Sequence, residues 1–397
     1  MNQSACHLPV PVLLLFALTL NGFAASYQSD SLSPGATISL LTASPGEELY
    51  SVFGHSALRV YDPVHQIDEV YNYGTFDFDT PNFYWKFTRG KLLYQLSVSS
   101  LSAFLGEYQY EGRAVYEQVL ALDPDEMQRL YHFLQINRLP ENRDYLYDFF
   151  FDNCATRIRD VIDNYVDIVW ADDVFRGPPR SFRDMLHPYL GNLPWPAFGI
   201  DLALGLPSDR VARPWEYMFL PDEMFMAFAH ARRTDGRPLV QGFRDLLQET
   251  LEREEPPYLT PNKLMWIIFL IRGLSFFSRR FSRGFDLVYF SLLGVGGLLI
   301  AFLWFLSDHD ATNNNLVLLW MLPTHLYFIF GTLSSSPRRM VMYYFRVVFG
   351  INLLLLAFWL ALPQDFNEAF FPLILIAAAK AFSIGFRPRR LYPLSTH

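Results

Sequence analysis

The sequence predicts an exported α+β domain followed by an all-α transmembrane helical bundle. Three observations lead to this fold class. An apolar run lies near the N-terminus, the segment up to residue 255 is charged and rich in aromatic residues, and most of residues 258–386 is apolar. The chain has 397 residues, which is enough for a soluble domain and a membrane region together.

Residues 1–25 are typical of a signal peptide. The apolar run 9-PVPVLLLFALTL-20 is followed by Gly22 and Ala24, which fit the −3 and −1 positions of a cleavage site. No Lys or Arg precedes the run, so an uncleaved anchor is the alternative. Either interpretation exports the chain that follows. Cys6 lies inside this segment without a lipid-anchor motif, which leaves Cys154 as the single cysteine of the exported part.

The exported part begins with strand patterns and continues with helices. Short β-branched and aromatic runs predict a small antiparallel sheet from 37–43, 49–62, 69–78 and 113–122. Apolar periodicity predicts helices at 123–139, 155–168, 221–232 and 238–253. Pro124 follows Asp123, as at a capped helix start. Residues 175–220 are rich in Pro, Gly and Trp, and we expect an irregular loop there.

Four apolar spans predict membrane crossings: Leu287–Leu306, Leu316–Leu333, Val341–Leu362 and Ala369–Phe386. Arginine is concentrated in 279–283, 334–339 and 387–397, which places these three segments in the cytoplasm. This orientation requires a fifth, marginal crossing at 258–277, whose apolar core is interrupted by Arg272. We therefore expect a periplasmic domain at 26–256, a transmembrane domain at 257–390 and a cytoplasmic tail at 391–397.

The composition excludes several classes of function. The net charge is −8, and no basic stripe appears in the soluble part, so we expect no nucleic-acid partner. His and Cys do not fall at zinc-ligand spacings, and no glycine-rich phosphate loop is present. We therefore expect no metal and no cofactor.

The stretch 151-FDNCATRIRD-160 places Cys154 at the start of an amphipathic helix. A helix N-terminus favours thiolate, because its N–H groups and dipole stabilise negative charge. Asn153 is a cap residue that could also orient an oxyanion donor, and Arg157 adds positive charge. An exported cysteine without a partner is either a buried spectator or a working thiol.

A nucleophilic cysteine needs a base, and His55 is the best candidate. It lies in the predicted strand 52-VFGHSALRVYD-62 between Gly54 and Ser56, which leave room for a substrate. The neighbouring strand offers Asn72 to orient the imidazole, with Tyr71 and Tyr73 as alternatives. The residues alone leave two interpretations open, an exported Cys–His enzyme and a non-catalytic membrane scaffold.

Several motifs together resemble the Lnb-type family of membrane-bound bacterial lipoprotein N-acyltransferases. The resemblance is carried by GHSALRV at 54–60, DNCATRIRD at 152–160, 70-VYNYGTFDF-78, 83-FYWKFTRGKLLYQL-96 and segments at 195–205, 217–224 and 307–326. The order of histidine strand and cysteine helix is also similar to a circularly permuted papain-like (NlpC/LRAT-like) fold. The resemblance implies that Cys154 and His55 are catalytic, and Asn72 stays a prediction for the third residue.

The resemblance further implies the substrates, an acyl-donor phospholipid and an acceptor lipoprotein, and a thioester on Cys154. We assign Ser56, Arg59, Asn153 and Arg157 to oxyanion stabilisation or substrate binding. Asp308 and His309, in the polar loop 307-SDHDATNNN-315, are expected on the same side of the membrane as Cys154 and are candidates for substrate binding. The apolar stretch 193–206 is expected to dock on the bilayer, to form an acyl slot, or to be an ordinary core loop.

A membrane-tethered cysteine hydrolase acting on cell-wall peptides is the alternative enzyme, since papain-like scaffolds also serve that use. Five crossings argue against it, because a single anchor is enough to tether a wall hydrolase.

Overall fold

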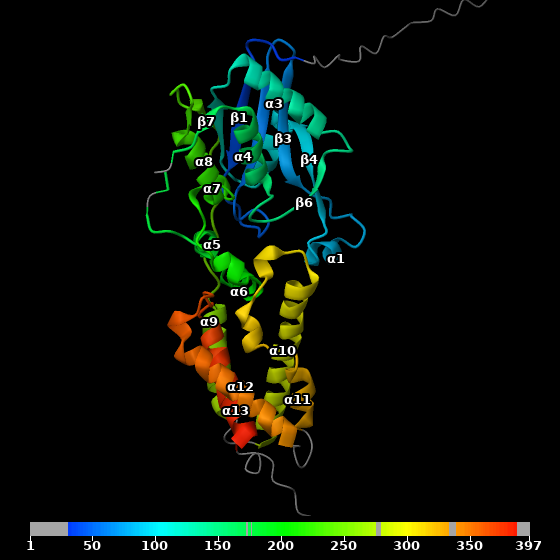
Figure 1. The fold of residues 1–397 in the computed structure, drawn as a ribbon, viewed down its shortest axis with the longest axis vertical. Coiled ribbons are helices and arrows are strands. Elements are labelled where there is room, and N and C mark those ends of the chain that lie inside the picture. The colour runs from blue at the N-terminus through cyan, green and yellow to red at the C-terminus, as the bar shows by residue number, and fades with distance from the viewer. Residues whose placement is uncertain (1–30, 172–173, 176, 275–278, 333–338, 387–397) are drawn as a thin grey trace, which may run out of the picture.

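The computed structural model describes residues 31–171, 174–175, 177–274, 279–332 and 339–386. A sheet domain stands on a helical bundle, with two short helices between them (Figure 1). The predicted signal peptide at 1–25 and tail at 391–397 lie outside the described residues.

A seven-stranded antiparallel sheet forms the centre of the first domain, with strand order β6-β4-β3-β2-β1-β5-β9. The strands are β1 Thr37–Ala43, β2 His55–Asp62, β3 Ile67–Thr75, β4 Leu93–Ser100, β5 Val115–Leu120, β6 Asp144–Leu146 and β9 Val240–Leu247. A pair of two-residue strands, β7 Ile168–Val169 and β8 Arg232–Arg233, lies apart. The predicted antiparallel sheet is confirmed.

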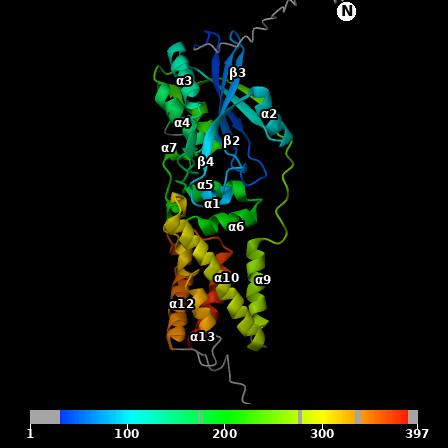
Figure 2. The ribbon, with the colours of Figure 1, turned by 90° about the vertical axis from the view of Figure 1, so that its right-hand side faces the viewer.

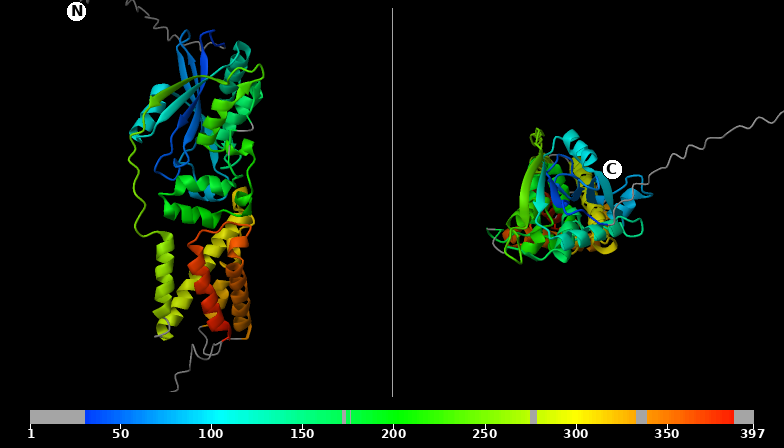
Figure 3. Two further views of the ribbon diagram at one scale, coloured as in Figure 1. Left: turned by 90° about the vertical axis from the view of Figure 1, so that its left-hand side faces the viewer. Right: turned by 90° about the horizontal axis from the view of Figure 1, so that it is seen from above.

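The helix predicted at 238–253 is wrong, because these residues supply the edge strand β9. Its pairing with β5 supplies the reason: Phe243 lies opposite Gln118, and its ring stacks on Tyr116 at 6.0 Å between centroids. The apolar periodicity within one segment does not reveal that the segment pairs with another strand. After β9 the chain runs down the outside of the molecule to α9 in an extended path (Figure 3).

Helices cover both faces of the sheet. On one face lie α3 (Pro124–Asn137), α4 (Cys154–Tyr165) and α8 (Pro221–His230), and α2 (Leu101–Tyr110) packs on the other (Figure 2). Asp123 and Glu126 form a capping box at the start of α3. The predicted helices at 123–139, 155–168 and 221–232 are thus confirmed, with ends that differ by one to three residues.

Helix α4 shows why these residues fold as they do. Ile158 and Ile162 are fully buried against the sheet, and Val161 is nearly so. These three positions form one stripe of the helix. The helix ends where Val166 turns to an extended conformation and its N–H still donates to the carbonyl of Ile162.

The stretch 175–220, expected to be irregular, contains helices. These are α5 Phe182–Leu190, α6 Pro194–Ala203, the 3-10 turn η1 Leu206–Asp209 and α7 Pro214–Tyr217. Pro194 and Pro214 occupy the first turns of their helices, where the missing N–H costs nothing. The proline-rich composition therefore marked helix starts as well as loops.

The second domain is built from apolar helices: α9 Pro261–Leu274, α10 Arg279–Leu306, α11 His325–Gly331, α12 Arg339–Ala357 and α13 Phe370–Phe386. Within the described chain, Phe281–Leu306 and α12 are long and apolar enough to cross a membrane, and α13 is a shorter apolar helix.

The segment Leu316–Leu333, predicted as a membrane crossing, is not one continuous helix. It consists of the 3-10 turn η3 (Leu316–Leu319), a bend at Pro323 and the short helix α11. Asn315 and Gln364 satisfy the irregular backbone here: the Gln364 side-chain oxygen accepts from the N–H of Leu316, and the Asn315 side-chain oxygen accepts from the N–H of Val317. Irregular backbone at membrane depth is tolerated where protein buries it in this way.

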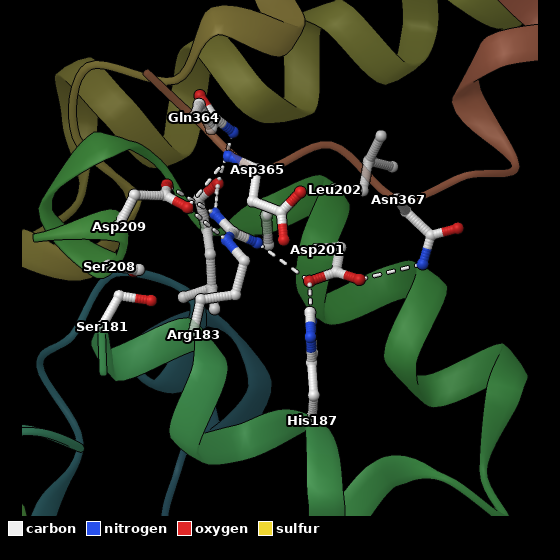
Figure 4. A network of polar contacts seen from close by, with 12 residues as sticks. Ser181, Arg183, His187, Asp201, Leu202, Ser208, Asp209, Gln364, Asp365 and Asn367 are labelled. Atoms are coloured by element: carbon white, nitrogen blue, oxygen red, sulfur yellow. Dashed lines mark hydrogen bonds and ion pairs between the residues drawn. The ribbon is translucent and has the colours of Figure 1, made fainter. Parts of the chain in front are cut away.

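A polar network joins the sheet domain to the bundle (Figure 4). The buried guanidinium of Arg183 on α5 binds Asp201 of α6 at 2.9 Å and Asp209 at 2.8 Å. Asp201 also accepts from Asn367 at 2.9 Å, and Asn367 lies in the loop between α12 and α13. Arg183 and Asp201 each bind more than one partner. This network, here called the joint, therefore holds α5 and α6 against the bundle.

We predict that Gly297→Ala destabilises the bundle. A Cβ at Gly297 of α10 would lie 1.8 Å from the carbonyl oxygen of Met321, so one of the two segments must shift. Overpacking of this kind costs about 1–3 kcal/mol. The midpoint of thermal unfolding in mild detergent should fall. Gly284→Ala on the same helix meets no atom within 4 Å and is the matched control. Equal midpoints for the two variants would contradict the close packing of α10 on the 316–324 segment.

Candidate active site

The end of the sheet nearer the bundle brings β2, β3 and the start of α4 together at Gly74. The pairing of β3 with β4 shifts register between Asn72 and Thr75, and Gly74 has a φ of +91° there. A Cβ added to Gly74 would lie 3.5 Å from Cβ of Cys154 and 3.9 Å from Cε1 of His55. Gly74 therefore lies beside both predicted catalytic side chains, and only glycine adopts this φ without strain.

Cys154 is the first residue of α4 and is 8% exposed. Burial acts to raise the pKa of its thiol. The charge and hydrogen bond of His55, together with the backbone N–H groups of Ser56 and Ala155, act in the opposite direction and lower the pKa overall. These donors stabilise a thiolate, the nucleophilic form.

Asn153 holds the helix start in place. Its side-chain oxygen accepts from the N–H groups of Ala155 and Thr156, both at 2.9 Å. Its amide nitrogen donates to the carbonyls of Phe149 and Phe219 at 2.8 Å. Both polar groups of the side chain are engaged in the cap, so the geometry gives Asn153 a positioning role instead of the oxyanion-orienting one that we predicted.

His55 lies at the first residue of β2, not in the middle of a strand as expected. Its Nε2 is 2.6 Å from Oδ1 of Asn72, and its ring stacks on Tyr108 with centroids 6.5 Å apart. With Nε2–H donating to the amide oxygen, Nδ1 carries the lone pair that can take a proton.

Burial acts to lower the pKa of His55. The negative charge of Cys154 and hydrogen bonds with Cys154 and Asn72 outweigh it, and the pKa is raised overall despite the opposing charge of Arg113. A raised histidine pKa beside a lowered thiol pKa favours an imidazolium–thiolate pair.

The alternatives to Asn72 contact other groups. The hydroxyl of Tyr71 donates to Glu69 at 2.8 Å, and that of Tyr73 donates to Asn137 at 2.6 Å. Both tyrosine rings belong to the core on the α3 side of the sheet. The structure thus brings His55, Asn72 and Cys154 together.

The remaining residues of the two core motifs have varied surroundings. Ser56 gives its backbone N–H to the thiol, and its buried hydroxyl has no hydrogen-bond partner among the described residues. Arg157 pairs with Asp152 at 2.6 Å and lies 3.6 Å over the ring of Tyr145. Ser56 therefore borders the thiol, and Arg157 borders Tyr145.

Arg59, which we predicted to bind substrate, has partners within the sheet domain. It lies about 13 Å along β2 from His55. Its buried guanidinium pairs with Asp68 at 2.7 Å and with Glu117 at 2.9 Å. These ion pairs hold the sheet together and direct the side chain to carboxylates of the fold.

Asp308 and His309 contact the segment around α1 (Phe83–Thr88). Asp308 forms an ion pair with Lys91, and Nε2 of His309 is 2.8 Å from the carbonyl oxygen of Phe87. Their recorded partners in the described chain lie on this segment, not at Cys154. These two contacts link the bundle to the sheet domain.

Sequence reasoning missed three side chains that surround the thiol. Tyr108, Tyr145 and Tyr147 all have a pKa raised first by burial and also by the negative charge of Cys154. Tyr145 and Tyr147 alternate along a short strand directly before the cysteine motif, and this was the available signal.

We predict that His55→Gln slows alkylation of Cys154 by iodoacetamide at neutral pH and moves the midpoint of its pH profile to higher pH. The reason is that the imidazolium charge and hydrogen bond, which lower the thiol pKa, are lost. His132→Gln, on an exposed position of α3, is the control and should follow the wild type. An unchanged midpoint in His55→Gln would show that the helix start alone sets the thiol pKa.

Comparison with known proteins identifies the family. The family model of the Lnb N-terminal periplasmic domain matches residues 23–185, and that of the Lnb transmembrane domain matches residues 253–387. No curated protein and no solved structure matched the chain. The two family models follow one another in the order of the sheet domain and the bundle. The chain therefore belongs to the Lnb family of lipoprotein N-acyltransferases, with an N-terminal periplasmic domain and a transmembrane domain.

Proposed function

We propose that the protein moves a fatty acyl chain from a phospholipid, through a thioester on Cys154, to the α-amino group of the lipidated N-terminal cysteine of a lipoprotein. The observation that carries this proposal is the contact of His55 with both Cys154 and Asn72. Thiol, base and orienting amide are the three parts that acyl transfer by a cysteine enzyme requires.

In the first half-reaction, His55 accepts the thiol proton and the sulfur attacks the ester carbonyl of the phospholipid. The tetrahedral intermediate carries a negative oxygen. The backbone N–H of Cys154, the first residue of α4, is a candidate donor to this oxygen. The carbon–oxygen bond then breaks, His55 returns the proton to the glycerol oxygen, and a lysophospholipid leaves.

In the second half-reaction, the free amine of the acceptor attacks the thioester carbonyl. His55 takes one proton from the amine, the carbon–sulfur bond breaks, and the proton returns to the sulfur. The product is an amide-linked acyl chain and the enzyme is restored. Asn72 keeps the imidazole in the same orientation for both half-reactions.

The fold of the first domain supports a circularly permuted papain-like arrangement as part of the proposal. The histidine lies on a strand of an antiparallel sheet, and the cysteine begins a helix that packs on this sheet later in the chain. We place the domain, residues 26–256, on the periplasmic face of the bacterial inner membrane, with residues 257–390 crossing it five times.

The membrane domain has a physical purpose in this reaction. Moving an acyl chain through water exposes methylene groups at about 0.8 kcal/mol each. The end of the sheet that carries Cys154 faces the bundle (Figure 1), so the thiol lies on the side of the domain from which lipids arrive. A membrane-tethered cysteine hydrolase acting on cell-wall peptides gains nothing from this placement, because its substrates are not lipids.

We predict that wild-type protein incubated with phospholipid in mild detergent gains the mass of one acyl chain on Cys154. Intact-protein mass spectrometry should show a hydroxylamine-sensitive adduct that is absent from Cys154→Ala. Adding a diacylated lipopeptide with a free amine should discharge it. A reactive, intact thiol that gains no adduct would overturn the phospholipid donor, and cell-wall peptides would then be tested as substrates of a hydrolase.

We predict that Asn72→Ala lowers the rate of acyl-enzyme formation by about 10²-fold, because an imidazole without its orienting bond loses much of its effect as an acid–base catalyst. The apparent KM for phospholipid should not change. Asn164→Ala, at an exposed position of α4, is the matched control. A rate in Asn72→Ala within twofold of the control would remove Asn72 from the mechanism.

A further inference from the structure

The segment 76–92, here called the aromatic arm, leaves β3 just after Gly74 and returns as β4. It contains α1, in which no residue is buried. Four of its aromatic side chains are largely exposed: Phe78 at 66%, Tyr84 at 78%, Trp85 at 56% and Phe87 at 50%. Large exposed aromatic groups gathered on one short segment mark an interaction surface.

The arm lies beside the end of α10 that is nearer the sheet domain (Figure 1). The ring of Trp85 is 5.5 Å from that of Phe302 on α10, and the N–H of Asp308 donates to the carbonyl of Arg89 at 3.0 Å. The last turns of α10 expose Phe305 and Leu306 by 65% and 61%. The exposed rings of the arm therefore continue the apolar surface of a helix long enough to cross a membrane.

The charges of the arm fit a lipid surface. Lys86, Arg89 and Lys91 accompany the aromatic side chains, against Asp77 and Asp79. Aromatic rings at the level of the headgroups, with Lys and Arg near the phosphates, are typical of the membrane–water boundary. This composition favours a bilayer as the occupant of the surface.

A series of aromatic contacts leads from the arm to the thiol. The ring of Phe78 is 4.9 Å from that of Phe76, Phe76 is 5.2 Å from Tyr94, and Tyr94 is stacked on Tyr147 at 4.3 Å. Tyr147 and Cys154 border the same residue: a Cβ added to Gly74 would lie 3.9 Å from Cε2 of Tyr147 and 3.5 Å from Cβ of Cys154. The rings thus form a continuous apolar track between the exposed surface and the nucleophile.

We propose that the aromatic arm is the lipid-loading element of the enzyme. Its exposed rings rest in the outer leaflet of the membrane beside α10, and its track of rings guides the acyl ester of one phospholipid to Cys154. This inference rests on the proposed function for the identity of the donor. It adds to the proposed function the surface of the protein that removes the donor phospholipid from the bilayer.

The loading role is tested with the full-length double variant Tyr84→Gln/Trp85→Gln. Two acyl donors are compared by mass spectrometry of Cys154: a long-chain phosphatidylethanolamine in bilayer nanodiscs and a short-chain p-nitrophenyl ester in water. Acylation by the phospholipid should fall by about tenfold or more, because burying an aromatic ring in lipid is worth at least this factor. Acylation by the soluble ester should not change.

Tyr110→Gln is the matched control, since Tyr110 is an aromatic residue on α2 that is 93% exposed. It should leave both reactions unchanged. Equal losses with the two donors in the double variant would show that the arm acts only through the shape of the site, and would overturn the loading role. An unchanged rate of acylation by the phospholipid in the double variant would also overturn the loading role.

The membrane contact is tested separately with spin labels in a Cys6→Ser/Cys154→Ser background. A nitroxide at Tyr84→Cys should be accessible to oxygen and shielded from a water-soluble nickel complex. The control label at Val64→Cys, at the far end of the sheet in the turn between β2 and β3, should show the reverse. A label at 84 that is exposed to nickel, or shielded from both reagents as at a site buried within protein, would overturn the lipid contact.

The two sets of measurements separate this inference from the proposed function. A wild-type protein that takes no acyl group from phospholipid would overturn the donor assignment and the loading role, whatever the spin labels show. A wild-type acyl-enzyme together with a label at 84 in water would overturn the arm and leave the proposed function standing.

Discussion

The capping of α4 by Asn153 is the interaction on which the candidate site depends. One amide side chain accepts two N–H groups of the helix and donates to two carbonyls from separate loops, at Phe149 and Phe219. A helix cap contributes about 0.5–2 kcal/mol to stability. Here it also fixes the position of the next residue, Cys154, relative to the strand that carries His55. The cap thereby holds the start of α4, and with it Cys154, in a fixed position.

The second constraint is the close approach of backbone at Gly74. The register shift in β3 and the positive φ of this residue let the sheet end pass directly beside the thiol and the imidazole. Asn72 precedes the shift and faces His55, whereas Tyr71 and Tyr73 point into the core on the opposite face. Alternation along one strand thus separates Asn72, whose side chain contacts His55, from the tyrosines that pack in the core.

Local signals predicted much of the fold and of the site. We could predict the cap and apolar stripe of α4, the capping box of α3 and the short strands of the sheet. The sequence pattern that indicates each of them lies within a few residues. His55, Asn72 and Cys154 were found because each lies in a motif with a chemical reason for its residue type. The contact between them, over 99 positions of sequence, rests on strand pairing that no local pattern contains.

The incorrect predictions have the same cause. Residues 240–247 form a strand because β5 offers an open edge, and the span after Leu316 is broken because Asn315 and Gln364 satisfy its backbone from elsewhere in the chain. Arg59, Asp308 and His309, which we predicted to bind substrate, also have partners in distant parts of the fold. Residue type shows what a side chain can do, and only its partners show what it does.

The joint around Arg183 has a consequence for how the enzyme meets its substrates. Ion pairs and hydrogen bonds tie α5 and α6 to the loop between α12 and α13, so the sheet domain cannot tumble freely above the membrane. The thiol is then held at one height. For an enzyme acting as proposed, the search for both reactants takes place in two dimensions, and its rate follows their surface density in the leaflet instead of their bulk concentration.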